Sequence, residues 1–406
     1  MSGTYNAAIL PIIADCQDEA DTAQVWLDET VDTLTRALTS YHITATLRSA
    51  RLTPNAALVR YQGNDNITVS RIETRGEMLL TSWGIEIVAV RAGRGYIDVM
   101  VARDRRVVVP TAALWKRREL PDTAPHYNTS LLLGEREDTG EPLYVNLAHP
   151  FGGQPVSGPH MLIAGESGGG KSVLTSNILM ELCATNSPEM ARIHLIDPKS
   201  GVDYSWIEKM PHLDGAIVTD MEDSLVRYGT IVTEMNRRYE DLLGPTRSRD
   251  IDAYNGRVAE GDKIPRIYVF HDEMADWMTD DDYRNDVGKM LSRISAKGRA
   301  AGVHLVLITQ RPDKKAIPGA IKANISTKIA LRVSSKVNSN IIIDESGAEQ
   351  LLGQGHMLAM VGGMNGGPLF AQAPFLDDWD AEIMALALTD APGGEAENVV
   401  TLDKAA

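Results

Sequence analysis

The hydrophobic pattern divides the chain into a region of one helix followed by strands and a longer region of alternating elements. In the first region, apolar residues recur at near-helical spacing across 21–41, which predicts an amphipathic helix. Short apolar runs separated by turn residues then predict strands at 57–61, 67–72, 85–90 and 96–101. A helix followed by strands indicates a small α+β domain, expected at 21–125.

From residue 159 onward, short apolar runs alternate with helical patterns. The runs predict strands at 161–164, 193–196, 267–270, 305–308 and 325–333, and weaker candidates at 131–133 and 143–145 precede them. Helices are predicted at 173–184, 221–243 and 282–301. This alternation is typical of an α/β domain with a largely parallel sheet, expected at 126–390. Residues 1–20 are expected to be a peripheral segment, and 391–406 a disordered acidic tail.

Composition says more about the cellular setting of the protein than about its fold. The apolar run at 7–14 is too short to span a bilayer and lacks the basic start of a signal peptide, so no membrane insertion is expected. Two cysteines, Cys16 and Cys183, without metal-like spacing favour a reduced, cytoplasmic protein. The net charge of −15 divides into −7 before residue 36, −7 from residue 377 and about −1 between them, so local basic loops that bind nucleic acid are not excluded.

The strongest chemical signal is the sequence G-E-S-G-G-G-K-S at 165–172, between a predicted strand and a predicted helix. It matches G-x-x-x-x-G-K-[ST], the phosphate-binding P-loop. Lys171 is expected to reach the β- and γ-phosphates of ATP, and the Ser172 hydroxyl to hold Mg²⁺. The expected nucleotide-binding residues are Gly165, Glu166, Ser167, Gly168, Gly169, Gly170, Lys171, Ser172 and Val173.

Two later strands end in polar residues that suit ATP hydrolysis. The apolar run 267–270 leads to His271, Asp272 and Glu273, the pattern of a Walker B element. Asp272 would support the Mg²⁺, and Glu273 would polarise the attacking water. Gln310 follows the run 305–308, where it would sense the γ-phosphate or, alternatively, only cap the strand. His271 should point to the other face of the sheet, as a hydrogen-bonded core residue.

Eight segments between residues 159 and 353 carry a more specific pattern. They are 159–165, 195–199 (Leu-Ile-Asp-Pro-Lys), 235–239 (Met-Asn-Arg-Arg-Tyr), 300–305, 309–312 (Thr-Gln-Arg-Pro), 321–325, 333–336 and 347–353. In this order and spacing they resemble the motor of the FtsK/SpoIIIE DNA translocases. The resemblance is strong over 159–375 and extends weakly back to about residue 20.

The resemblance implies a RecA-like P-loop ATPase core that uses ATP and Mg²⁺. It also implies a homohexameric ring around double-stranded DNA, with each nucleotide between two subunits. A neighbour's arginine would then stabilise the transition state, and Arg332 and Arg299 are the candidates, each of which could instead only form a salt bridge. DNA contacts would be made to phosphates, without sequence preference. The expected DNA-contacting residues are Arg247, Arg249, Lys314, Lys315 and, more weakly, Lys322.

The chain departs from the family pattern in two respects. Lys328 stands where the family often has arginine, and the membrane helices and winged helix that often accompany the motor are not found here. A bare motor favours a plasmid, phage or defence setting, with an unidentified partner that confers direction or anchoring. The alternatives are a ring ATPase that acts on a protein substrate and a nucleotide-gated assembly or binding module without translocation.

Overall fold

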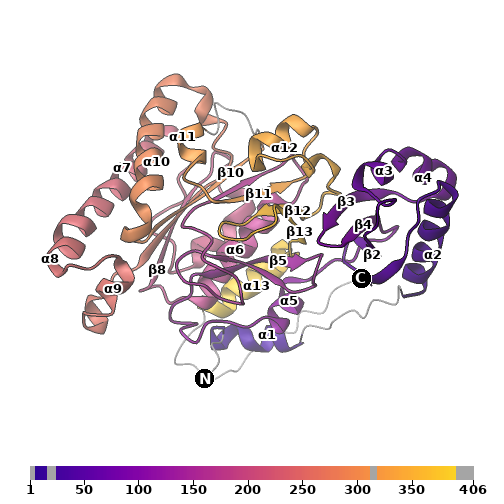
Figure 1. The fold of residues 1–406 in the computed structure, drawn as a ribbon. Coiled ribbons are helices and arrows are strands. Elements are labelled where there is room, and N and C mark those ends of the chain that lie inside the picture. Colours follow the sequence, from indigo (N-terminus) through magenta and orange to yellow (C-terminus); the bar gives the residue numbers. More distant parts are fainter. Residues whose placement is uncertain (1–4, 16–23, 311–317, 390–406) are drawn as a thin grey trace.

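The computed structural model describes residues 5–15, 24–310 and 318–389, and they form a smaller and a larger body (Figure 1). The smaller body contains a four-stranded antiparallel sheet in the order β1-β2-β4-β3. Its strands are β1 (Leu47–Leu52), β2 (Ala56–Gln62), β3 (Ile87–Gly93) and β4 (Tyr96–Ala102). Among the described residues, every helix is too short or too polar to cross a lipid bilayer.

Both faces of the small sheet pack against other elements. Helices α2 (Gln24–Ser40), α3 (Val69–Glu73) and α4 (Gly76–Trp83) lie on the side away from the larger body (Figure 1). Leu34 of α2 packs there with Val59 and Val99. On the opposite face, Leu58 and Met100 join a core of the larger body. Because successive strand residues face opposite sides, β2 and β4 hold the two bodies together.

The predicted strand at 67–72 is wrong, because this segment contains the helix α3. The Thr68 hydroxyl accepts a hydrogen bond from the amide of Arg71 at 3.3 Å, which is an N-cap contact. Ile72, one turn later, is fully buried against the small-body core. The β-branched residues of the segment favoured a strand, but the cap and the burial of Ile72 stabilise one helical turn. Strand β1 and helix α4 were not predicted from the pattern.

The larger body is built on a nine-stranded sheet in the order β6-β5-β13-β12-β11-β7-β10-β9-β8. The strands are β5 (Ser130–Arg136), β6 (Pro142–Asn146), β7 (Met161–Ala164), β8 (Ala191–Ile196), β9 (Arg266–His271), β10 (Val303–Thr309), β11 (Thr327–Leu331), β12 (His356–Met360) and β13 (Leu369–Gln372). The five strands from β11 to β8 are parallel, as predicted, whereas the other four pair antiparallel. The parallel half therefore matches the predicted alternation of strands and helices.

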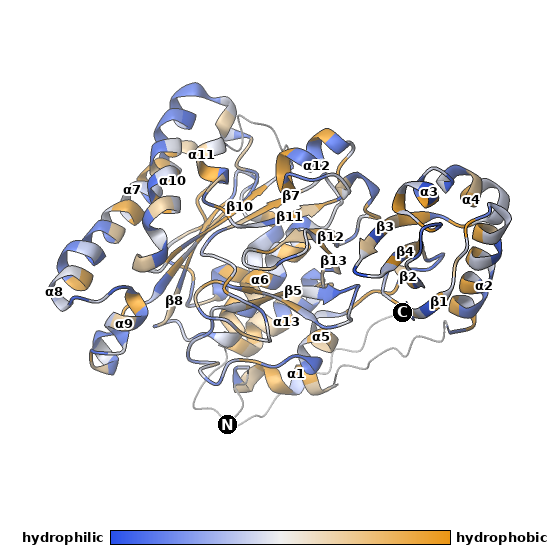
Figure 2. Ribbon diagram, in the orientation of Figure 1, coloured by the Kyte–Doolittle hydropathy of each residue, from blue (hydrophilic) through white to orange (hydrophobic). Residues whose placement is uncertain are grey.

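Helices cover both faces of this sheet, and its strands are mostly apolar (Figure 2). One face carries α1 (Leu10–Asp15), α5 (Thr111–Arg117), α6 (Lys171–Thr185) and α13 (Asp378–Thr389). The other carries α7 (Met221–Arg237), α10 (Asp281–Ala301), α11 (Gly319–Lys322) and α12 (Lys336–Ile343). A π-helical segment, Arg238–Leu243, and the short helices α8 (Gly244–Thr246) and α9 (Ile251–Asn255) follow α7. His271 of β9 is a buried core residue that bonds the Tyr228 hydroxyl at 3.0 Å.

The segments that flank the small body pack on the larger one. Tyr5 stacks on Trp115 with ring centroids 4.6 Å apart, and Ile9 is fully buried in the same core. The expected domain limits, 1–20, 21–125 and 126–390, stay a prediction. The expected tail at 391–406 lies outside the described residues.

Candidate nucleotide-binding site

The P-loop connects the end of β7 to the start of α6, and its backbone geometry requires glycine at two positions. Gly168 and Gly170 have φ values of 74° and 105°, which side-chain-bearing residues rarely adopt. A Cβ atom at Gly170 would lie 2.6 Å from the backbone nitrogen of Gly355. The Gly355 amide also donates to the Gly169 carbonyl at 2.9 Å. The loop is therefore an open cradle of backbone groups, which suits a phosphate chain.

Lys171 begins α6, and its ammonium group is held inside this cradle. Its Nζ donates to the carbonyl oxygens of Gly165 and Glu166, each at 2.9 Å. An ammonium has three protons, so one remains for a phosphate oxygen. Burial lowers the pKa of Lys171, and the nearby carboxylates of Glu273 and Asp272 oppose that shift. These carboxylates favour the charged form that binds phosphate.

Asp272 and Glu273 follow β9, which pairs with β10, the neighbour of β7. Glu273 is 4% exposed, and its Oε1 accepts a hydrogen bond from the backbone amide of Gln310 at 3.0 Å. Its Oε2 lies 3.8 Å from Nζ of Lys199. Burial raises the pKa of Glu273, while the Gln310 amide and the Lys199 charge oppose the rise. A buried carboxylate held in this way can accept a proton from water.

The two expected metal ligands each contact a residue that the sequence analysis did not single out. The Ser172 hydroxyl donates to Oδ2 of Asp203 at 2.7 Å, and the Tyr204 hydroxyl donates to Oδ2 of Asp272 at 2.7 Å. Hydroxyl and carboxylate oxygens are the ligand types that Mg²⁺ prefers. Ser172 and Asp272 therefore fit a Mg²⁺ site.

A cleft of about 350 Å³ lies over the P-loop and is also lined by Asp203. Its polar lining includes Lys171, Ser172 and Gln310, three of the residues that the sequence analysis singled out. Its apolar lining includes Phe375, which is half exposed. A pocket of this size, with an apolar wall and a few polar groups, suits a small organic anion such as a nucleotide.

Comparison with known proteins agrees with this geometry. Residues 121–314 match the model of the FtsK/SpoIIIE family. The DNA translocase SftA of Bacillus subtilis is 34% identical over 385 residues, which are 93% of this chain and 38% of SftA. The chain belongs to the FtsK/SpoIIIE family. The DNA translocase FtsK of Pseudomonas syringae pv. tomato is 33% identical to this family member, over 80% of the chain and 42% of that protein. The chain thus spans about two fifths of the length of these relatives.

Solved structures confirm the fold expected for this FtsK/SpoIIIE family member. The pCW3 conjugation coupling protein TcpA, in a monomer form with ATPγS, aligns with a TM-score of 0.60 and 24% identity. The alignment covers 89% of this chain and 99% of that one. The cytoplasmic domain of the Thermomonospora curvata type VII secretion ATPase EccC aligns with a TM-score of 0.56 and 23% identity, over 70% and 33% of the two chains. The larger body therefore has a RecA-like P-loop fold, and a smaller α+β body accompanies it.

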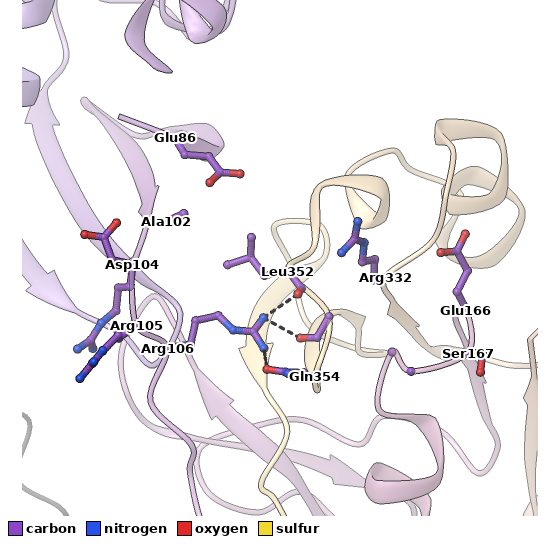
Figure 3. A pocket seen from close by; sticks show the side chains of 14 residues that line it. Glu86, Ala102, Asp104, Arg105, Arg106, Glu166, Ser167, Arg332, Leu352 and Gln354 are labelled. Atoms are coloured by element: carbon purple, nitrogen blue, oxygen red, sulfur yellow. Dashed lines mark hydrogen bonds between the residues drawn. The ribbon is translucent and has the colours of Figure 1, made fainter. Parts of the chain in front are cut away.

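A second cleft, of about 740 Å³, separates the P-loop from the small body (Figure 3). Arg332 lines it beside Glu166 of its own chain, and the Arg332 carbonyl accepts from the Glu166 amide at 2.9 Å. The other expected trans arginine, Arg299, is exposed near the end of α10. Because α10 leads into the amino end of β10, Arg299 lies at the edge of the sheet opposite the P-loop. The structure therefore does not bring these two arginines together.

The expected DNA-contacting residues occupy different environments. Arg249 is 88% exposed beside Asp250, and Arg247 lies next to it in the loop after α8. Lys322 is bonded to Asp344 at 2.7 Å, and the same carboxylate binds Lys328 at 2.8 Å. Lys314 and Lys315 lie outside the described residues. The contacts of these side chains with DNA stay a prediction.

Proposed function

We propose that this chain is an ATP-driven motor that moves double-stranded DNA through a homohexameric ring. The observation that carries the ATPase part is the arrangement of Lys171 and Ser172 at the start of α6 beside the buried Glu273, whose Oε1 is fixed by the Gln310 amide. The DNA part rests on the family and on relatives that are named DNA translocases.

In this function, Lys171 binds the phosphates and Glu273 takes the proton of the attacking water. Ser172 and Asp272 hold the Mg²⁺, which neutralises negative charge on the phosphates when it is bound. Gln310 joins Glu273 to the segment that follows β10, so its backbone transmits a change at the nucleotide to that segment. Each of these residues acts from its own subunit.

Arg299 is the better candidate for the arginine that acts in trans. Its place at the edge of the sheet opposite its own P-loop suits a contact with another subunit's nucleotide. Arg332 lines a cleft beside its own P-loop, which favours a role within one subunit.

We also propose a cytoplasmic setting and a plasmid, phage or defence context, with an unidentified partner that confers direction or anchoring.

The test is the steady-state ATPase rate of the chain with and without long linear duplex DNA, at several salt concentrations. We expect a duplex-specific stimulation that falls steeply with salt, because phosphate contacts release counterions. Arg249→Ala should reduce the stimulation and lower the salt slope by about one. Lys289, which is 75% exposed on α10, provides the control Lys289→Ala.

Other outcomes would favour the alternatives. A robust ATPase rate that no DNA changes would favour a protein substrate. ATP binding without turnover would favour a nucleotide-gated assembly or binding module.

A further inference from the structure

Asp203 and Tyr204 are adjacent in η2 (Val202–Lys209), a 3₁₀ segment with a kink at Tyr204, and each contacts a different side chain of the expected Mg²⁺ site. Asp203 accepts a hydrogen bond from the Ser172 hydroxyl, and Tyr204 donates one to Asp272, both at 2.7 Å. One short element therefore contacts both metal-site residues, although these lie on different elements, α6 and the end of β9.

The contact with Asp203 fixes the direction of the Ser172 hydroxyl. A serine hydroxyl has one proton to donate and two lone pairs. With its proton directed to Oδ2 of Asp203, the lone pairs of the Ser172 oxygen point away from that carboxylate. They are then free for a cation. Without Asp203, the hydroxyl could rotate and direct its proton elsewhere.

The contact with Tyr204 fixes the orientation of the Asp272 carboxylate. Its Oδ1 accepts from the Glu273 amide at 2.7 Å and its Oδ2 from the Tyr204 hydroxyl. Two donors on two different oxygens define the plane of the carboxylate. Tyr204 is fully buried in the core below α6, so packing holds its hydroxyl in place.

The turn before η2 is itself rigid. The Asp197 carboxylate, at the end of β8, accepts from the amides of Lys199 at 2.9 Å and Gly201 at 2.8 Å. Gly201, with φ of 69°, then starts η2. This turn presents Asp203 and Tyr204 to the site from a fixed backbone.

We propose that Asp203 and Tyr204 are positioning residues for the Mg²⁺ that accompanies ATP, Asp203 through Ser172 and Tyr204 through Asp272. This inference rests on the proposed ATPase function and adds two residues that set metal affinity. Groups that orient metal ligands typically contribute 10- to 100-fold to metal affinity. Binding of ATP without metal depends on the P-loop and should not depend on these residues.

The test separates metal-dependent from metal-free nucleotide binding. ATPγS affinity of the full chain is measured by calorimetry in EDTA and at increasing Mg²⁺, and Mn²⁺ binding in the presence of ATPγS is followed by electron paramagnetic resonance. Asp203→Ala and Tyr204→Phe should leave the affinity for ATPγS in EDTA unchanged. They should raise the Mg²⁺ concentration at which half of the gain in ATPγS affinity is reached by about tenfold or more. Asp203→Asn keeps an acceptor oxygen and should be intermediate. Glu208→Gln, exposed on the same helix, is the matched control and should behave as wild type.

The outcomes distinguish the two proposals. If wild type binds ATPγS with Mg²⁺ but neither variant shifts the Mg²⁺ midpoint, the positioning role is wrong and the proposed function stands. If wild type binds no ATPγS in either medium, both proposals fail. An equal loss of affinity with and without metal would also contradict positioning, because it indicates a general disturbance of the pocket.

Discussion

Glu273 illustrates at the scale of one residue how a functional carboxylate is constrained. Its φ of 41° lies in the left-handed region, which costs an L-residue free energy. The hydrogen bond from the Gln310 amide and the burial of the side chain hold this conformation. The backbone strain therefore belongs to the residue that is expected to activate water.

Replacing Glu273 with glutamine should separate binding from turnover. The amide has the same shape but cannot accept the proton of water, so turnover should fall by roughly 100-fold or more while ATP affinity is retained. Steady-state ATPase rates and nucleotide affinity measure the two properties. The control is Glu240→Gln, at an exposed position. Normal turnover in Glu273→Gln would exclude Glu273 as the base.

Lys199 should control the pH at which Glu273 works. Burial raises the pKa of Glu273 above its usual 4.5, and the charge of Lys199 opposes this rise. Because the base must be ionised, turnover falls as pH falls through this pKa. Lys199→Met removes the opposing charge, so the acidic limb of the kcat profile should move to higher pH. Lys289→Met should leave the limb unchanged, and an unchanged limb in Lys199→Met would contradict the prediction.

At the scale of elements, a buried ion pair joins the end of α5 to α6, the helix that starts with the P-loop. The side chains of Arg118 and Glu181 are 0% and 1% exposed. Arg118 also donates to the Ser130 carbonyl, and Glu181 accepts from the Leu132 amide at 2.9 Å. The pair therefore fixes α5 and β5 against the helix that carries Lys171.

Breaking this pair should destabilise the fold strongly. Glu181→Gln leaves the Arg118 charge buried without its counter-ion, which should lower the free energy of unfolding by about 3–5 kcal/mol. Urea unfolding measures the change. The double variant Arg118→Met, Glu181→Leu should be closer to wild type, because no unpaired charge remains. Lys289→Met, which breaks an exposed pair with Asp286, should cost less than about 1 kcal/mol.

At the scale of the whole molecule, the small body supports the nucleotide site through Arg106 (Figure 3). Arg106 donates to the carbonyls of Leu352 at 2.7 Å and Gly353 at 3.0 Å and to the Gln354 side chain. The next residue, Gly355, bonds the P-loop at Gly169. The small body and the P-loop are thus connected through one short segment.

Loss of Arg106 should weaken ATP binding although it lies outside the cleft that holds Lys171. Hydrogen bonds from a charged group contribute about 1.5–3 kcal/mol, and part of that loss should reach the P-loop. We expect Arg106→Ala to reduce ATP affinity by roughly threefold to tenfold, measured by calorimetry. Arg105→Ala, at the exposed neighbouring position, should have no effect. Equal effects of the two variants would exclude this connection.

Buried histidines should make the whole molecule sensitive to acid. Burial lowers the pKa of His160 and His194 to about 4 and of His271 to about 3. The unfolded chain takes up protons at about pH 6.5, so this stability is complete above 6.5 and is lost as pH falls towards 4. The urea concentration at the midpoint of unfolding should decrease as the pH is lowered from 7.5 to 5. His271→Asn should flatten this dependence, and His42→Asn, at an exposed position, should not.

The sequence by itself determined the P-loop, the Walker B strand and the parallel half of the sheet. Glycine spacing, apolar runs and strand ends are local signals. In the structure Lys171, Ser172 and Gln310 line one cleft, and Glu273 bonds the backbone amide of Gln310. The pattern gave the wrong element at α3, where a cap competed with β-branched residues, and it missed β1 and α4.

Tertiary structure alone decided which distant groups complete the site. Asp203 meets Ser172 across 31 positions, Tyr204 meets Asp272 across 68, and Arg106 meets Leu352 across 246. The antiparallel strands and the place of Arg332 beside its own P-loop were likewise not visible in the pattern. Such contacts arise when separate segments pack on a common sheet, and neither spacing nor periodicity encodes which segments meet.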